Sequence, residues 1–132
     1  MRGVGTAVPA ATARVTALMG GGWTVGASGD ATGDVYIGTE DLVGTDFDDF
    51  LGGDAGANVL SGGLGDDILE GRGGADQLRG DAGFDIVSHI YAAAAVTVSL
   101  ASGTGTAGDA AGDSYFQIEG VYGSAYADTL TG

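Results

Sequence analysis

One set of acidic and amide side chains recurs every nine residues through the middle of the chain. Its members are Glu40, Asp49, Asn58, Asp67, Asp76 and Asp85. Carboxylate oxygens are hard ligands, and Ca²⁺ takes about six to eight oxygens in proteins. The chain has 18 Asp and Glu against four Lys and Arg, which gives a formal net charge of −14. This charge disfavours nucleic acid and anionic membrane surfaces as partners and favours a hard divalent cation.

Columns of aliphatic residues and glycines keep the same spacing and predict the elements that position these oxygens. The aliphatic column is Leu42, Leu51, Leu60, Leu69, Leu78 and Val87. The glycine columns are Gly44, Gly53, Gly62, Gly71 and Gly80, and Gly56, Gly65, Gly74 and Gly83. Each unit predicts a glycine-rich turn followed by a short strand whose central aliphatic side chain points inward.

Two nine-residue units complete one turn of a stack, so loops on the same edge are expected 18 residues apart. This spacing predicts three facing pairs: Asp49 with Asp67, Asp67 with Asp85, and Asn58 with Asp76. The inward aliphatic ladder is thin for the number of residues that must be ordered. We therefore expect folding to depend on a bound cation.

The unit at residues 62–70 reads G-G-L-G-D-D-I-L-E and fits the pattern G-G-x-G-x-D-x-U-x, where U is a large aliphatic residue. This pattern resembles the RTX (hemolysin-type calcium-binding) repeat family over residues 44–88 and again over 119–132. The resemblance implies an all-β fold, a right-handed parallel β-roll (β-solenoid) with flanking strand-rich cap segments. The expected organisation is a strand/loop cap at 1–38, the nonapeptide roll at 39–88, an inter-repeat cap at 89–122 and the start of a further repeat at 123–132.

In this family, each Ca²⁺ lies between two stacked loops and takes an Asp carboxylate and two backbone carbonyls from each. Carried over, the resemblance implies about three ions. The first site combines Gly63, Gly65 and Asp67 with Gly80, Ala82 and Asp85. The second combines Asp54, Gly56 and Asn58 with Gly71, Gly73 and Asp76. The third combines Thr45, Phe47 and Asp49 with Gly62, Leu64 and Asp67. The amide of Asn58 and the replacement of glycine by Phe47 leave the occupancy of the last two sites open.

A longer duplication surrounds the repeats, because residues 29–52 resemble residues 108–131 with an offset of 79. The loop G-D-A-T-G-D at 29–34 corresponds to G-D-A-A-G-D at 108–113, and the sequence leaves open whether these loops bind metal. Strands are expected around 15–18 and 96–100. The chain stops within the first loop of a new repeat, which favours a fragment of a longer protein. The alternative is head-to-tail self-association through open roll ends.

Catalytic motifs are missing from the sequence, which predicts that the chain is not an enzyme. It contains no G-x-S-x-G, H-E-x-x-H or P-loop. The single histidine, His89, follows Ser88 on an expected strand, where neighbouring side chains point to opposite faces. No apolar run reaches the length of a membrane span. The aromatic residues are expected mostly in the caps or core: Trp23, Phe84, Tyr91, Tyr115, Phe116, Tyr122 and Tyr126.

The resemblance implies a calcium-binding module of a secreted bacterial RTX-type protein, which passes type I secretion machinery and folds outside the cell. Its expected location is extracellular or at the cell surface. Two alternatives remain open. One is a self-associating, calcium-dependent adhesin or surface-assembly protein. The other is an accessory C-terminal module of an RTX enzyme, such as a lipase, protease or epimerase, whose catalytic domain is not in this sequence. The activity of the parent protein, the export signal and the oligomeric state cannot be derived from the sequence.

Overall fold

A computed structural model describes residues 16–20, 23–28, 35–37, 41–44, 46–53 and 55–132. These residues form 14 strands and one short 3₁₀ turn, and they contain no α-helix, which confirms the all-β class. None of their helices is long and apolar enough to cross a membrane. Glu40, Thr45 and Asp54 lie outside the described residues.

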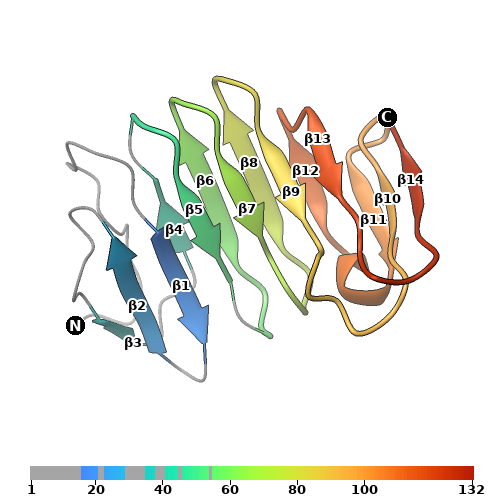
Figure 1. Cartoon of the computed structure of the whole chain (residues 1–132), viewed down its shortest axis with the longest axis horizontal. Coiled ribbons are helices and arrows are strands. Elements are labelled where there is room, and N and C mark those ends of the chain that lie inside the picture. The colour runs from blue at the N-terminus through green and yellow to red at the C-terminus, as the bar shows by residue number, and fades with distance from the viewer. Residues whose placement is uncertain (1–15, 21–22, 29–34, 38–40, 45, 54) are drawn as a thin grey trace.

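The nonapeptide strands alternate between two sheets that face each other (Figure 1). One sheet contains β4 (Asp41–Val43), β6 (Val59–Gly63) and β8 (Gln77–Asp81). The other contains β5 (Phe50–Gly52), β7 (Ile68–Glu70) and β9 (Ile86–Ser88). Within these two sets, neighbouring strands are parallel and 18 residues apart, so that Leu42 pairs with Leu60 and Leu51 with Leu69. The predicted 18-residue stacking is therefore confirmed.

The core is the predicted aliphatic ladder, and all six of its side chains are fully buried: Leu42, Leu51, Leu60, Leu69, Leu78 and Val87. A three-residue strand turns only its central side chain inward, because successive side chains alternate between faces. β6 and β8 are two residues longer than the predicted strands, because their pairing continues into the glycine turn as far as Gly63 and Asp81. The core is continued by Val96, Val98, Ala110 and Tyr115 in the second half of the chain.

The duplicated segments have the same topology. The first contains β1 (Thr16–Gly20), β2 (Trp23–Ser28) and β3 (Val35–Ile37), followed by β4 and β5. The second contains β10 (Thr97–Ser99), β11 (Thr104–Ala107), the 3₁₀ turn η2 (Gly108–Ala110), β12 (Ser114–Phe116), β13 (Gly120–Tyr122) and β14 (Thr129–Thr131). The bounds of β12, β13 and β14 are those of β3, β4 and β5 shifted by 79. The strands expected near 15–18 and 96–100 are confirmed as β1 and β10.

In each copy, the first strand pairs in antiparallel with the second and in parallel with the last. β1 pairs with β2 and β5, and β10 pairs with β11 and β14. The second copy docks on the nonapeptide stack, because β12 pairs in parallel with β8 and β13 with β9. The stack thus continues through the inter-repeat segment at 114–122.

Of the aromatic residues expected mostly in the caps or core, four lie in the segment 89–122: Tyr91, Tyr115, Phe116 and Tyr122. Tyr115 is buried, but the other expected residues whose side chains are described are about half exposed or more: Phe84, Tyr91, Phe116, Tyr122 and Tyr126. The reason is geometric. These five lie in loops, turns or at the outward third position of a strand, whereas Tyr115 is at the central, inward position of β12.

Candidate metal centres

The carboxylates of successive loops form a hydrogen-bonded ladder along each edge of the stack. Asp67 Oδ1 accepts a hydrogen bond from the Asp49 backbone N–H at 2.8 Å, and Asp85 Oδ1 accepts one from Asp67 N–H at 2.8 Å. On the other edge, Asp76 Oδ1 accepts from Asn58 N–H at 2.9 Å. The three facing pairs expected from the 18-residue spacing are therefore confirmed.

The second oxygen of two of these carboxylates has no donor. The Oδ2 atoms of Asp67 and Asp85 are buried and have no hydrogen-bond partner in the structure, and the two residues are at most 1% exposed. A buried acceptor without a partner is costly, so native structures rarely leave one unless an ion or a water molecule binds there. These two oxygens are therefore candidate ligands for a cation.

A backbone carbonyl from the following coil lies beside the carboxylate at the first glycine of the repeat. A Cβ atom at Gly62 would overlap Asp67 Oδ2 and would lie 2.9 Å from the Gly80 carbonyl oxygen. Gly62 thus leaves the space in which the two oxygens approach each other. Asp67 and Gly80 belong to the same predicted site, so the structure brings these two ligands together.

The same arrangement occurs at the other two predicted sites. At Gly53, the Asn58 Oδ1 atom and the Gly71 carbonyl converge, and at Gly44 the Asp49 Oδ2 atom and the Gly62 carbonyl converge. Among the described residues, no group of three His, Cys, Asp or Glu side chains is placed to hold a metal ion. The candidate centres therefore depend on backbone oxygens, which Ca²⁺ accepts readily.

The other predicted ligands are backbone carbonyls of the stacked loops. The Gly63 carbonyl accepts a hydrogen bond from Ala82 N–H at 3.1 Å, and Gly73 lies over Ala55. Phe47 and Leu64 are 44% and 52% exposed, and the Phe47 carbonyl lies against Gly65 of the next stacked loop. The role of these carbonyls as ligands stays a prediction.

Position four of the repeat separates the regular loops from the irregular ones. Gly65, Gly74 and Gly83 have φ between +88° and +122°, the left-handed region that favours glycine. Phe47 and Gly56, at the same position of the first two loops, are not in this region. The first predicted site therefore lies between two loops of regular conformation, whereas the second and third each include one loop that departs from it.

Burial and like charge make these carboxylates reluctant to ionise without a cation. Burial raises the pKa of Asp67 to about 7, and the negative charges of Asp49 and Asp85 add to the rise. Burial also raises the pKa of Asp85, with a contribution from the nearby Glu119. A bound divalent cation would offset both effects, because an opposite charge stabilises the ionised carboxylate.

Two further aspartates continue the ladder, but protein donors occupy both of their oxygens. Asp113 Oδ1 accepts from Asp76 N–H at 2.9 Å, and its Oδ2 accepts from the Tyr115 hydroxyl at 3.3 Å. Asp128 accepts from Val96 N–H and from the backbone and hydroxyl of Ser124. The sequence signal for Asp113 was its Gly-Asp loop, but its place in the ladder depends on the docking of β12 on β8.

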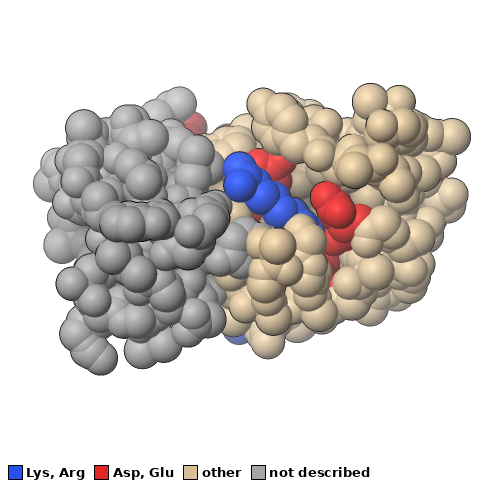
Figure 2. Space-filling model, turned by 90° about the horizontal axis from the view of Figure 1, so that it is seen from below, with Lys and Arg blue, Asp and Glu red and all other residues tan. Residues whose placement is uncertain are grey.

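A separate small pocket of about 110 Å³ lies beside the sheet that contains β7 and β9. Figure 2 shows acidic and basic side chains gathered in one band on the face below the view of Figure 1. Both carboxylate oxygens of Glu70 are buried without a hydrogen bond, and Arg72 Nε lies 3.8 Å from one of them. Burial raises the pKa of Glu70, which keeps this group closer to neutral.

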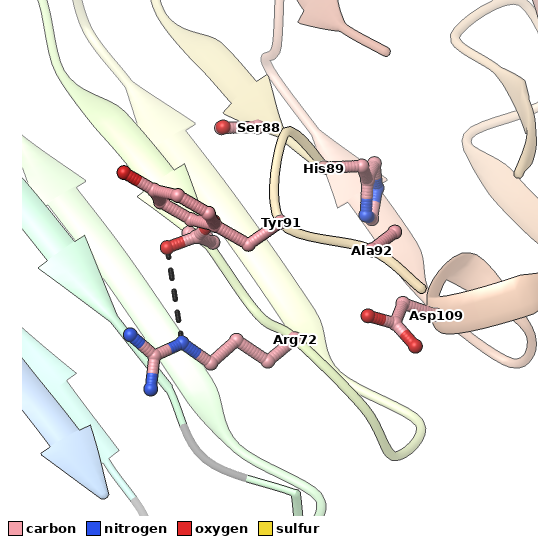
Figure 3. A pocket seen from close by; sticks show the side chains of 7 residues that line it. Arg72, Ser88, His89, Tyr91, Ala92 and Asp109 are labelled. Carbon is pink, nitrogen blue, oxygen red and sulfur yellow. Dashed lines mark ion pairs between the residues drawn. The ribbon is translucent and has the colours of Figure 1, made fainter. Parts of the chain in front are cut away.

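His89 and its neighbour Ser88 both line this pocket, and Figure 3 shows their side chains pointing in different directions. The His89 ring is buried, and its Nε2 atom lies 3.2 Å from the Tyr115 hydroxyl. Burial lowers the pKa of His89, so the ring is held neutral. This arrangement agrees with a structural role for His89.

The fold and the site together define a class of protein built from short stacked repeats with candidate cation sites between their loops. Residues 34–69 and 52–87 each match the family described as the RTX calcium-binding nonapeptide repeat (4 copies). The segment 34–87 is therefore similar to the calcium-binding repeats of this family. A comparison with curated proteins found no match.

Proposed function

We propose that this chain is a calcium-dependent folding module of an RTX-type protein, in which a right-handed β-roll closes around ions bound between its loops. The observation that carries the proposal is the pair of buried Oδ2 atoms without a donor, at Asp67 and Asp85. Next to Asp67, a carbonyl from the following coil supplies a second oxygen. About three ions would fill the three sites assigned from the repeat pattern.

The energetics favour coupling between folding and ion binding. The core of the roll is a single aliphatic ladder, while the loops bring like charges together along each edge. Ion binding to the folded state alone stabilises it by mass action, by about 2.7 kcal/mol at a hundred times the dissociation constant. In a compartment poor in Ca²⁺ the chain would remain unfolded, which suits export by type I secretion and folding outside the cell. The proposed role is binding and structural, not catalytic.

Far-UV circular dichroism and sedimentation velocity test this proposal. We expect β-structure and a compact particle in millimolar Ca²⁺, and loss of both in EGTA. Mg²⁺ at the same concentration is the matched control and should restore little, because it prefers a small octahedron and retains water. An unchanged β-signal in EGTA would contradict the coupling of folding to calcium.

A second candidate function is calcium-dependent end-to-end assembly, and one comparison within the chain favours it. Leu130 in β14 is the counterpart of Leu51 in β5, yet Leu130 is 45% exposed and Leu51 is fully buried. The difference arises because β7 covers β5, whereas no described strand covers the outward edge of β14. An open strand edge with an exposed core-type leucine is a surface that pairs readily with another strand.

The internal docking of β12–β13 on β8–β9 supports a specific geometry for this assembly. The exposed pair β13 and β14 starts nine residues apart, as the docked-upon pair β8 and β9 does. The pair β3 and β4 has the same spacing as the pair β12 and β13, which docks on β8 and β9. A second copy would therefore place its β3 on β13 and its β4 on β14. Light scattering in Ca²⁺ should show mass that rises with protein concentration, lost in Leu130→Glu and kept in the control Tyr91→Glu. A monomer at every concentration would remove this candidate.

A further inference from the structure

We infer that the roll has an additional cation site at its junction with the inter-repeat segment, formed by Asp85, Gln117 and Glu119. The three sites assigned from the repeat pattern do not include Gln117 or Glu119. The observation is at Gly80, where a Cβ atom would overlap both Asp85 Oδ2 and the Gln117 carbonyl oxygen. This is the same convergence of carboxylate and carbonyl that marks Gly62, Gly53 and Gly44.

Strand pairing places Gln117 and Glu119 in the positions of repeat residues. Because Phe116 pairs with Arg79, the next residue, Gln117, stacks on Gly80. Because Gly120 pairs with Ile86, the preceding residue, Glu119, stacks on Asp85. A three-residue turn, 117–119, thus takes the place of the six-residue loop 80–85. The repeat pattern could not identify it, since the spacing changes at this turn.

Glu119 performs the structural role of the repeat aspartate. Its Oε2 atom accepts a hydrogen bond from Asp85 N–H at 2.8 Å, as Asp85 Oδ1 accepts one from Asp67 N–H at 2.8 Å. The longer side chain of Glu compensates for the shorter turn. Gln117 has φ +54°, a left-handed conformation that is uncommon outside glycine, and this conformation aims its carbonyl at Gly80.

Asp85 supplies the oxygen that needs a ligand. It is fully buried, and its Oδ2 atom has no hydrogen-bond partner in the structure. At the two other ends of the carboxylate ladders, the last aspartate has donors on both oxygens. Asp113 accepts hydrogen bonds from Asp76 N–H and from the Tyr115 hydroxyl. Asp128, which lies against Gly123, accepts hydrogen bonds from the backbone N–H and the hydroxyl of Ser124.

The chemistry of these ligands fits a hard divalent cation, and Ca²⁺ is the one that accepts two carboxylates with several carbonyls in irregular geometry. If this site follows the pattern of the three repeat sites, the loop 80–85 adds the carbonyls of Asp81 and Gly83, as Gly63 and Gly65 do at the first site. Such an ion would bridge the last nonapeptide loop and the segment 114–122, and so fasten this segment to the roll. The inference rests on the proposed function, since it assumes that the nonapeptide loops bind Ca²⁺.

Counting bound ions tests the site. Equilibrium dialysis against Ca²⁺ is applied to the unmodified chain, to Glu119→Gln and to Asp128→Asn. Glu119→Gln keeps an oxygen to accept from Asp85 N–H and removes the charge. Asp128→Asn removes the same charge from a carboxylate whose oxygens are already bonded. We expect Glu119→Gln to bind one ion fewer than the unmodified chain and Asp128→Asn to bind the same number. Circular dichroism in Ca²⁺ verifies that each variant is folded.

Equal ion counts for the unmodified chain and folded Glu119→Gln would overturn the additional site while leaving the proposed function intact. No calcium bound to the unmodified chain would overturn both.

Discussion

Asp67 is the residue whose replacement separates the cost of the buried carboxylates from their benefit. It stacks between Asp49 and Asp85, and it belongs to two of the three sites assigned from the repeat pattern. Asp67→Asn keeps an oxygen for the hydrogen bond from Asp49 N–H and removes the charge. We expect the substitution to stabilise the chain in a chelator and to weaken its response to Ca²⁺.

The magnitude follows from the pKa of Asp67, which burial raises from its ordinary value of 3.8 to about 7. One pKa unit is worth about 1.4 kcal/mol, so ionising Asp67 at neutral pH costs the ion-free fold up to roughly 4 kcal/mol. The asparagine avoids this cost. With Ca²⁺ present the order reverses, because the variant lacks a carboxylate that two ions share.

Two titrations at pH 7.5, followed by circular dichroism, measure both effects. In EGTA, where the unmodified chain is expected to be unfolded, folding is induced with the osmolyte trimethylamine N-oxide. In millimolar Ca²⁺ the chain is unfolded with urea, and Asp128→Asn is the control in both solutions. We expect Asp67→Asn to fold at lower osmolyte than the unmodified chain in EGTA and to unfold at lower urea in Ca²⁺. If Asp67→Asn destabilises the chain in both solutions, Asp67 acts only through packing or hydrogen bonds and the reasoning is refuted.

Three further predictions concern the dependence of stability on pH, the aliphatic core, and the hydrogen bonds at the end of the carboxylate ladder. In EGTA, the pKa values of Asp67 and Asp113 in the folded chain are about 7, above their ordinary value of 3.8. The stability of the ion-free fold should therefore rise as pH falls from 7.5 to 6.5. Below pH 6.5, protonation of His89 in the unfolded chain opposes this rise, because burial lowers the pKa of His89 in the fold. Osmolyte-induced folding in EGTA that needs more osmolyte at pH 6.5 than at pH 7.5 would contradict this sign. Leu69→Ala should lower the free energy of unfolding in Ca²⁺ by about 2–5 kcal/mol, and Leu130→Ala by much less, because Leu69 is fully buried and Leu130 is 45% exposed. Equal losses in urea unfolding would argue against the aliphatic ladder as the core. Tyr115→Phe leaves Asp113 Oδ2 and His89 Nε2 without this partner and should cost about 1–3 kcal/mol in Ca²⁺, against no loss for Tyr122→Phe.

The regular part of the fold could be predicted from the sequence because its signals are periodic. A nine-residue period fixes which side chain of each strand points inward and which loops stack, so the burial of Leu60 and the pairing of Asp67 with Asp85 follow from spacing alone. The resemblance to a repeat family then supplied the ligand chemistry. None of this required long-range information.

The parts that could not be predicted depend on tertiary docking. Asp113 and Glu119 join the ladders only because β12 lies on β8 and β13 on β9, across insertions that break the period. The exposure of Phe84 and Tyr126 depends on the short strands, which have few inward positions for large side chains. The burial of Glu70 without a hydrogen bond has no signal in the sequence, since its column elsewhere holds Gly52, Ser61, Arg79 and Ser88.

The central claim is that Ca²⁺ binds between stacked loops, at the buried carboxylate oxygens that lack donors. Anomalous diffraction from crystals grown in Ca²⁺ tests it most directly, because it locates the ions themselves. The account predicts a peak that contacts Asp67 Oδ2 and the Gly80 carbonyl, with further peaks at the equivalent loop pairs. Ions found only on exposed carboxylates such as Asp66, with none between the loops, would contradict it.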